Sequence, residues 1–246
     1  MTKELKVPRE NGGISRIIIG PVAEHLPALT ADRRVIVITD PNLRDAYPDF
    51  VNRYEHIVIG LGEEHKTMDT LAQIYARLIE LGADRTTLLL GFGGGIVTDV
   101  TGFAASTYMR GLDFGFVATT LLSQVDASVG GKNGVNFEGY KNMVGVFNQP
   151  GFVICDTSLL ATLPEREVRS GLAEVVKSAL IANPDLVAML EGRSYADIAG
   201  NKPLIDTLVY ETIRIKADIV GKDEKEHGER KKLNLGHTVA HAIEKS

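Results

Sequence analysis

The segment of residues 88–108 constrains the fold most, because an apolar strand pattern runs directly into glycines and then into a helix pattern. Residues 88–90 are three leucines, which is typical of a strand buried on both faces of a parallel sheet. Glycines occupy positions 93–95, and the residues after them are mostly apolar and small. We therefore expect a strand-to-helix turn at residues 93–95, where a ligand can approach the bare backbone and the first helix amides can bind a phosphate or pyrophosphate.

Polar residues downstream decide between two interpretations of this turn. A tight turn with close helix packing uses the same glycines, and their spacing is not the usual G-x-G-x-x-G fingerprint. Charged and amide side chains nevertheless lie among small residues, where an ordinary domain has turns of no particular charge: Asp99, Asp126, Lys132, Lys141 and Asn142. We interpret this group as the lining of a pocket.

Strand and helix patterns alternate up to about residue 157, which predicts a mostly parallel sheet with helices on both faces. Strand-like runs occupy residues 14–19, 34–39, 54–60, 86–90, 114–118 and 152–156, and helix patterns occupy residues 68–81 and 96–108. Beyond residue 157 only helical periods follow, at residues 165–181, 184–191, 204–220 and from Gly236 onward. The expected architecture is an α/β domain over residues 1–157 followed by an all-α domain over residues 158–246. Because no cap closes the last helix before Ser246, we expect this second domain to be incomplete here.

Composition excludes several classes of protein. The chain has 246 residues, 44% hydrophobic and 24% charged, with a net charge of −5, so no basic surface indicates nucleic-acid binding. The single cysteine, Cys155, lies in an apolar strand pattern, which excludes a disulfide framework and indicates a buried thiol. The first residues lack the apolar core of a signal peptide, and no apolar run reaches the roughly 18 residues of a membrane span. We expect a cytoplasmic protein.

Two polar groups follow predicted strands, at the position where open α/β sheets bind ligands. Asp40 and Asn42 flank Pro41, and Glu63 and Lys66 follow the next strand. An Asp-Pro-Asn sequence is equally typical of an ordinary turn, so both interpretations stay open on this pattern alone.

The helix predicted at residues 165–181 presents Glu167, Gly171, Glu174 and Lys177 on one face. A Glu-Lys pair three residues apart is most often a surface ion pair. The small residues around Gly171 instead permit close approach by another segment, which favours a functional face.

His237 and His241 lie one helical turn apart, the spacing at which two imidazoles can bind one metal ion. With Glu174 as an oxygen ligand they would form a site of the Glu-plus-His type, which suits zinc with an open position for substrate. The alternative is that both histidines are core residues of an apolar helix.

Together these motifs resemble the 3-dehydroquinate synthase family from about Asp40 to the end of the chain. The segments that carry the resemblance are residues 93–99, 119–126, 128–132, 141–145, 163–177 and 233–237. The resemblance implies a Rossmann-like NAD-binding domain followed by a helical domain, with the active site between them. It implies NAD contacts from Asp40, Asn42, Glu63, Lys66, Gly94, Gly95, Asp99, Thr119, Thr120, Lys132, Lys141, Leu159, Thr162 and Glu167.

The resemblance further implies a divalent metal, zinc or alternatively cobalt, bound by Glu174, His237 and a third histidine expected beyond Ser246. Spacing alone makes His241 a ligand, whereas the family pattern makes it face the substrate, and we follow the family pattern. The implied catalytic residues are Lys132, Lys177, Lys216, Arg230, Asn234 and His241.

The implied reaction converts the sugar phosphate 3-deoxy-D-arabino-heptulosonate 7-phosphate to 3-dehydroquinate and phosphate, in the shikimate pathway of aromatic amino-acid biosynthesis. It comprises oxidation by NAD, phosphate elimination, reduction and aldol closure. Arg110, Asp126 and Asn142 would bind substrate, Arg110 reaching across a homodimer. A sibling sugar-phosphate cyclase that makes a cyclitol, a metal-dependent polyol dehydrogenase and a non-catalytic NAD-binding fragment are the alternatives.

Overall fold

A seven-stranded sheet forms the centre of the first half of the protein. The structure, a computed structural model, describes residues 2–9 and 12–236, and within this part the strand order is β1-β2-β9-β6-β5-β3-β4. All neighbouring strands are parallel except β1 and β2. The strands are β1 (Lys3–Pro8), β2 (Ile14–Ile19), β3 (Val35–Thr39), β4 (Glu55–Val58), β5 (Leu88–Gly93), β6 (Asp113–Ala118) and β9 (Phe152–Cys155).

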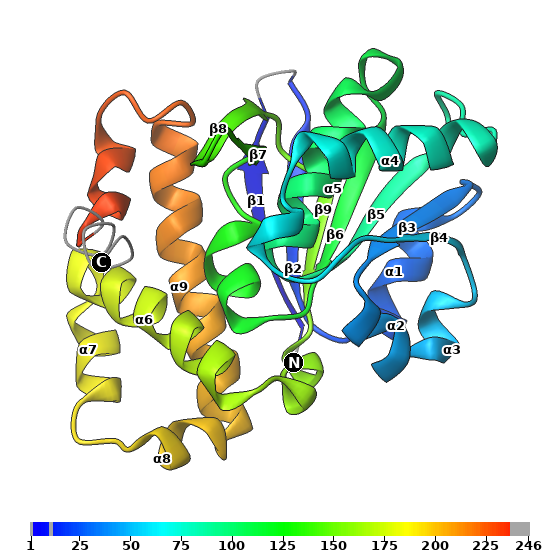
Figure 1. Cartoon of the computed structure of the whole chain (residues 1–246). Helices are drawn as coiled ribbons and strands as arrows, with labels where there is room; N and C mark the ends of the chain where they lie inside the picture. Colours follow the sequence, from blue (N-terminus) through cyan, green and yellow to red (C-terminus); the bar gives the residue numbers. More distant parts are fainter. Residues whose placement is uncertain (1, 10–11, 237–246) are drawn as a thin grey trace.

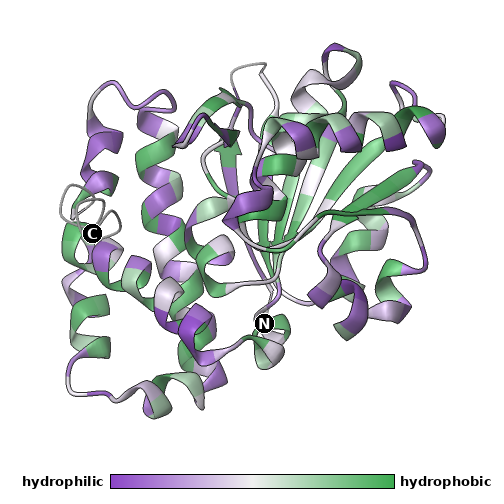
Figure 2. Ribbon diagram, in the orientation of Figure 1, coloured by the Kyte–Doolittle hydropathy of each residue, from purple (hydrophilic) through white to green (hydrophobic). Residues whose placement is uncertain are grey.

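Helices cover both faces of this sheet, as the alternation of patterns predicts (Figure 1). Along β3, Ile36 and Ile38 belong to one hydrophobic cluster, while Val35 and Val37 belong to another. Successive side chains of a strand point to opposite faces, so both faces are buried. Figure 2 accordingly shows hydrophobic residues along the central strands. One face carries α1 (Val22–Thr30), α2 (Pro41–Ala46) and α3 (Pro48–Val51), and the other carries α4 (Met68–Glu80) and α5 (Gly95–Thr107).

The predicted strand-to-helix turn is confirmed, since β5 ends at Gly93 and α5 begins at Gly95. A Cβ atom at position 93 would lie 2.4 Å from Cβ of Val97, so only glycine lets the helix start this close to the strand. The strand runs three residues past its predicted end at Leu90, because residues 91–93 pair with β6.

The second half of the described chain contains only helices. These are η4 (Thr157–Thr162), α6 (Glu165–Ala182), α7 (Pro184–Leu190), α8 (Tyr195–Ala199), α9 (Lys202–Lys222) and η5 (Glu229–Asn234). They match the predicted helical spans closely, and Cys155 is fully buried as expected. Whether residue 157 separates two domains stays a prediction, and the helix predicted from Gly236 onward lies outside the described residues.

A hairpin of β7 (Lys132–Phe137) and β8 (Tyr140–Phe147) connects β6 to β9 and was not predicted. Most of β8 is exposed, so its sequence lacks the apolar alternation by which a strand is recognised. Strand β1 was missed because it lies at the sheet edge and alternates Lys and Glu with apolar residues. Within the described residues no helix is both long and apolar enough to cross a membrane.

Close packing at Gly171 joins α6 to the first half of the protein, as its small-residue setting predicts. A Cβ atom at position 171 would lie 2.6 Å from Cβ of Leu121 and 2.7 Å from the backbone nitrogen of Leu122. The helix therefore approaches the neighbouring backbone more closely than any larger residue would allow.

We expect Gly171→Ala to lower the free energy of unfolding by about 1–3 kcal/mol, because the added methyl group forces α6 away from Leu121. Urea denaturation measures this change. The matched control is Gly221→Ala in α9, where a Cβ atom meets nothing within 4 Å and the better helix propensity of alanine stabilises by up to about 1 kcal/mol. Equal effects of the two substitutions would contradict the packing argument.

Candidate functional site

A cavity of about 990 Å³ lies at the carboxyl ends of β3, β5 and β6, closed on its other side by η4 and α6. This is where open α/β sheets bind their ligands. Residues predicted to form the site supply much of its lining: Asp40, Asn42, Glu63, Lys66, Gly94, Gly95, Asp99, Thr119, Thr120, Asp126, Lys141, Asn142, Leu159, Thr162, Glu167 and Glu174. The structure thus brings together the predicted cofactor residues apart from Lys132, although their binding roles stay predictions.

The start of α5 offers backbone donors to this cavity. Gly94 precedes the helix, no side chain caps it, and both Gly94 and Gly95 line the cavity. A Cβ atom at Gly94 would lie 2.9 Å from Cγ2 of Thr120, so glycine keeps this edge of the cavity open. Uncapped amides and the positive end of a buried helix suit a pyrophosphate group.

A buried ion pair joins Asp99 of α5 to Lys66. Lys66 Nζ donates to Asp99 Oδ2 at 2.5 Å and to Asn142 Oδ1 at 2.6 Å, and the side chains of Lys66 and Asp99 are only 6% and 18% exposed. Burial raises the pKa of Asp99 to about 6, although Lys66 opposes that shift. Asn142 has a φ of 53°, a strained conformation for a residue with a side chain.

A second buried pair joins α9 to the first half of the protein. Lys216 Nζ donates to Oδ1 of Asp126 at 2.5 Å and to its carbonyl oxygen at 2.7 Å. Burial lowers the pKa of Lys216, and the Asp126 carboxylate opposes this shift. The ammonium group is therefore held at the edge of the cavity that Asp126 lines.

Glu226 is a functional candidate that sequence reasoning missed. Its carboxylate accepts hydrogen bonds from Lys132 Nζ and from Asn234 Nδ2, so it joins two predicted catalytic residues. Burial acts to raise the pKa of Glu226, but the Lys132 and Asn234 hydrogen bonds prevail and hold it below its usual value. The charged run of residues 222–226 resembles a solvated loop in sequence. Only the contact between Glu226 and Lys132, which the fold creates, shows that Glu226 belongs with the candidate site residues.

Arg230 is 3% exposed and donates to the carbonyl oxygens of Gly130, at 2.9 Å, and of Glu224. Burial lowers the pKa of Arg230, opposed by Glu226 and other carboxylates nearby. A Cβ atom at Gly130 would lie 2.6 Å from the Arg230 guanidinium, which explains the glycine there.

Glu174 meets the requirements of an oxygen ligand for a metal ion. It lines the cavity, and its Oε2 atom is buried, forms an ion pair with Lys177 and makes no hydrogen bond of ordinary geometry to any described residue. The Glu174–Lys177 pair is therefore not an exposed surface ion pair, since the two side chains are only 20% and 11% exposed. Within residues 2–9 and 12–236 no three candidate ligands come together, and His237 and His241 lie outside the described residues.

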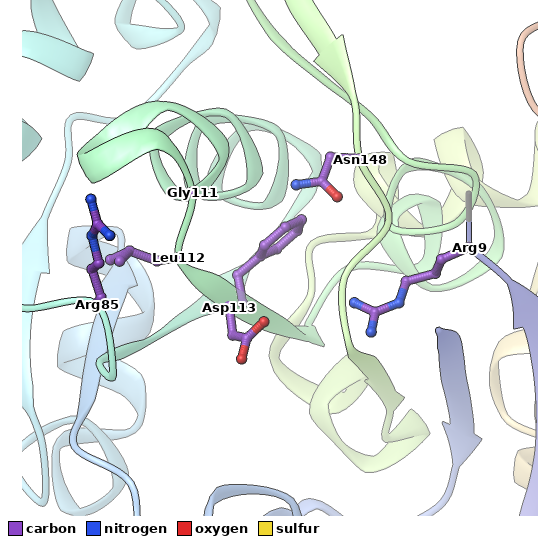
Figure 3. A pocket seen from close by; sticks show the side chains of 7 residues that line it. Arg9, Arg85, Gly111, Leu112, Asp113 and Asn148 are labelled. Atoms are coloured by element: carbon purple, nitrogen blue, oxygen red, sulfur yellow. The ribbon is translucent and has the colours of Figure 1, made fainter. Parts of the chain in front are cut away.

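Arg110 is exposed, has a φ of 69° and is not part of the cavity lining. A smaller pocket of about 260 Å³ opens nearby at the amino-terminal end of β6, lined by Arg9, Arg85 and Asn148 among others (Figure 3). The two arginines lie on opposite sides of this pocket, and none of the predicted site residues contributes to it.

Two solved structures share this architecture over almost the whole chain. A crystal structure of 2-deoxy-scyllo-inosose synthase is 28% identical with a TM-score of 0.86, covering 98% of this chain and 72% of that one. The 2-epi-5-epi-valiolone synthase ValA from Streptomyces hygroscopicus, with NAD⁺ and Zn²⁺ bound, is 27% identical with a TM-score of 0.84, covering 94% and 68%. The fold places the chain in the structural class of these two synthases.

Sequence narrows this class to one family. Residues 56–170 match the family described as 3-dehydroquinate synthase N-terminal, and residues 171–246 match 3-dehydroquinate synthase C-terminal. A 3-dehydroquinate synthase of Saccharophagus degradans is 45% identical over 89% of this chain and 62% of its own length, and one of Pyrococcus abyssi is 41% identical over 94% and 70%. The chain belongs to the 3-dehydroquinate synthase family. It spans 62–66% of the length of the first four relatives.

The raised pKa of Asp99 predicts a pH dependence of stability. The folded-state pKa of about 6 exceeds the ordinary value of 3.8, so between these pH values Asp99 is protonated in the folded protein and ionised in the unfolded chain. The free energy of unfolding therefore rises as the pH falls through 6. Relative to Asp99→Asn, the unchanged protein should gain about 1.4 kcal/mol of unfolding free energy between pH 7 and pH 5.

Urea denaturation at both pH values measures this difference. The control is Asp45→Asn, because the carboxyl group of Asp45 is exposed and its pKa is lowered by Arg44, so no gain toward acid is expected. A pH-independent difference for Asp99→Asn would show that the buried carboxyl group titrates normally.

Proposed function

We propose that this chain contributes the cofactor and substrate sites of a 3-dehydroquinate synthase, which converts 3-deoxy-D-arabino-heptulosonate 7-phosphate to 3-dehydroquinate and phosphate. The observation that carries the proposal is the cavity at the strand ends, where Glu174 and the expected NAD-binding residues other than Lys132 line one continuous space. Family membership supports the same reaction.

The hydrogen-bond donors that the cavity offers support NAD as its cofactor. The uncapped amides at Gly94 and Gly95 would hold the pyrophosphate of NAD, and Asp40 and Glu63, which line the same cavity, would contact its sugars. NAD when bound supplies a reversible hydride acceptor, and a divalent ion held through Glu174 supplies charge stabilisation at oxygen. Structural relatives with NAD⁺ bound, accompanied by Zn²⁺ or Co²⁺, support this assignment.

Cationic side chains beside the cavity suit a phosphorylated keto acid. Lys132, Lys216 and Arg230 are each held in place by an oxygen acceptor, which orients them before a ligand arrives. Their positive charges would bind the phosphate and carboxylate groups. The Lys132–Glu226 pair would also move protons between the substrate and a carboxylate.

Zinc is the metal we propose, with Glu174 and His237 as two ligands. Within the described residues the buried Oε2 atom of Glu174 pairs with Lys177 and makes no hydrogen bond of ordinary geometry, so a metal ion would satisfy it, and Lys177 would then face the substrate. His241 would face the substrate.

We also propose that the working protein is a homodimer. Arg110 is exposed and lies outside the cavity lining of its own chain, which leaves it available to a substrate bound by a second copy. The neighbouring Met109 and the hairpin residues Phe137, Tyr140 and Met143 expose apolar surface of the kind that subunits cover. Sedimentation of the protein gives its oligomeric state directly.

A sibling cyclase that makes a cyclitol is the second candidate, because the inosose synthase shares the fold at a TM-score of 0.86. The two reactions differ in whether the substrate carries a carboxylate, which Arg230 and Lys216 would bind. A sugar phosphate without a carboxylate is therefore the discriminating substrate.

The deciding experiment measures phosphate release from the heptulosonate phosphate, with NAD present and zinc either added or chelated. It uses this chain and a chimaera in which this chain is joined to the part of the Saccharophagus degradans relative that it does not match. We expect zinc-dependent release by the chimaera. If NAD binds but neither protein releases phosphate, the synthase assignment fails and an NAD-binding module remains.

Replacing Glu174 tests the metal site separately. In the zinc-dependent chimaera, Glu174→Gln should weaken zinc binding and reduce phosphate release by at least about tenfold, because a neutral amide is a poorer ligand than a carboxylate. The matched control is Glu165→Gln on the same helix, whose exposed ion pair with Arg169 should not matter. Equal zinc affinity in both variants, measured by competition with a chelating dye, would exclude Glu174 as a ligand.

A further inference from the structure

The turn after α9 presents two groups of the candidate site. Glu226 accepts from Lys132 in this turn, and Arg230 follows four residues later. Glu226 has a φ of 62°, and Gly228 has φ and ψ of −146° and −92°, so neither residue lies in a regular element. Something other than helix geometry must therefore hold the turn in shape.

Asp223 supplies the acceptors that the turn requires. Its Oδ1 atom accepts from the amide of His227 at 2.9 Å, and its Oδ2 atom accepts from the amides of Gly228 at 2.7 Å and Arg230 at 3.0 Å. These backbone hydrogen bonds lower the pKa of Asp223 to about 2. The carboxylate is therefore ionised at any pH at which the protein would work.

The position of this carboxylate is unfavourable for the helix itself. Asp223 directly follows the last residue of α9, where the helix dipole favours positive charge and a carboxylate is destabilising. Hydrogen bonds from three backbone amides compensate for this unfavourable position. We therefore attribute the aspartate at this position to the turn and not to the helix.

A second tether holds the same turn from the sheet side. Gln149 is 3% exposed, and its Nε2 atom donates to Oε1 of Glu224 at 2.6 Å and to the carbonyl oxygen of Pro8 at 3.1 Å. Glu224 in turn accepts a hydrogen bond from Arg230 through its carbonyl oxygen. The turn is thus fixed against both β1 and the segment before β9.

We propose that Asp223 is a positioning residue that fixes the turn of residues 223–230, so that Glu226 stays in contact with Lys132 and the guanidinium of Arg230 stays against Gly130. The significance of these two groups for a sugar-phosphate ligand rests on the proposed function. The geometry of the turn does not depend on it.

The first test is hydrogen exchange of the backbone amides of His227, Gly228 and Arg230 in this chain, without substrate. Asp223→Asn should accelerate at least tenfold the exchange of whichever amides lose their acceptor, because the NH₂ group that replaces one carboxylate oxygen cannot accept a hydrogen bond. The matched control is Asp218→Asn on the same helix, whose exposed ion pair with Lys222 leaves the turn untouched. Unchanged exchange in Asp223→Asn would overturn the proposal even if the chain proved to be a synthase.

The second test compares NAD affinity with phosphate release in the chimaera. Asp223→Asn should lower kcat/KM for the sugar phosphate by about tenfold or more and leave the Kd for NAD unchanged, since the turn does not line the NAD cavity. A parallel loss of NAD affinity would indicate a general structural role and overturn the proposal. If the unchanged chimaera releases no phosphate, the proposed function is contradicted. The hydrogen-exchange result then decides alone whether Asp223 fixes the turn.

Discussion

Burial of cationic side chains around one cavity is the constraint on which the rest of the structure depends. Lys66, Lys216 and Arg230 are 5%, 7% and 3% exposed. An unpaired charge at such a depth would cost several kcal/mol, so each needs an oxygen acceptor fixed nearby. The protein carries a net charge of −5, so the positive charge near the cavity comes from these individual side chains and not from the overall field.

These pairs also hold the two halves of the chain together. Lys216 in α9 donates to Asp126, Arg230 donates to Gly130, and Glu226 accepts from Lys132. In each case one partner precedes residue 157 and the other follows it. The same contacts that hold these charged side chains in place thus fix the helical half of the chain against the first half.

Sequence reasoning predicted the parts of the fold that depend on local pattern. The leucine run before Gly93 and the amphipathic repeat of α4 are visible because a buried strand and a half-buried helix have distinct periods. Strand β8 and strand β1 were missed because their pairing is decided by distant residues and much of their surface is exposed. In the candidate site, the motifs around Asp99 and Glu174 could be recognised, whereas Glu226 could not, since its role arises only when residues far apart in sequence meet.

The strand order has a consequence for how the protein is made. Strand β2 lies between β1 and β9, so its second edge is completed only by residues 152–155, near the end of the first half. During synthesis β1 and β2 are made before β9, so the edge of β2 that includes Ile17, Ile18 and Ile19 stays unpaired until β9 leaves the ribosome. Such long-range parallel pairing is slow to form, and an unpaired apolar strand edge invites association with other chains. The nascent protein is therefore most vulnerable to aggregation before its helical half has been made.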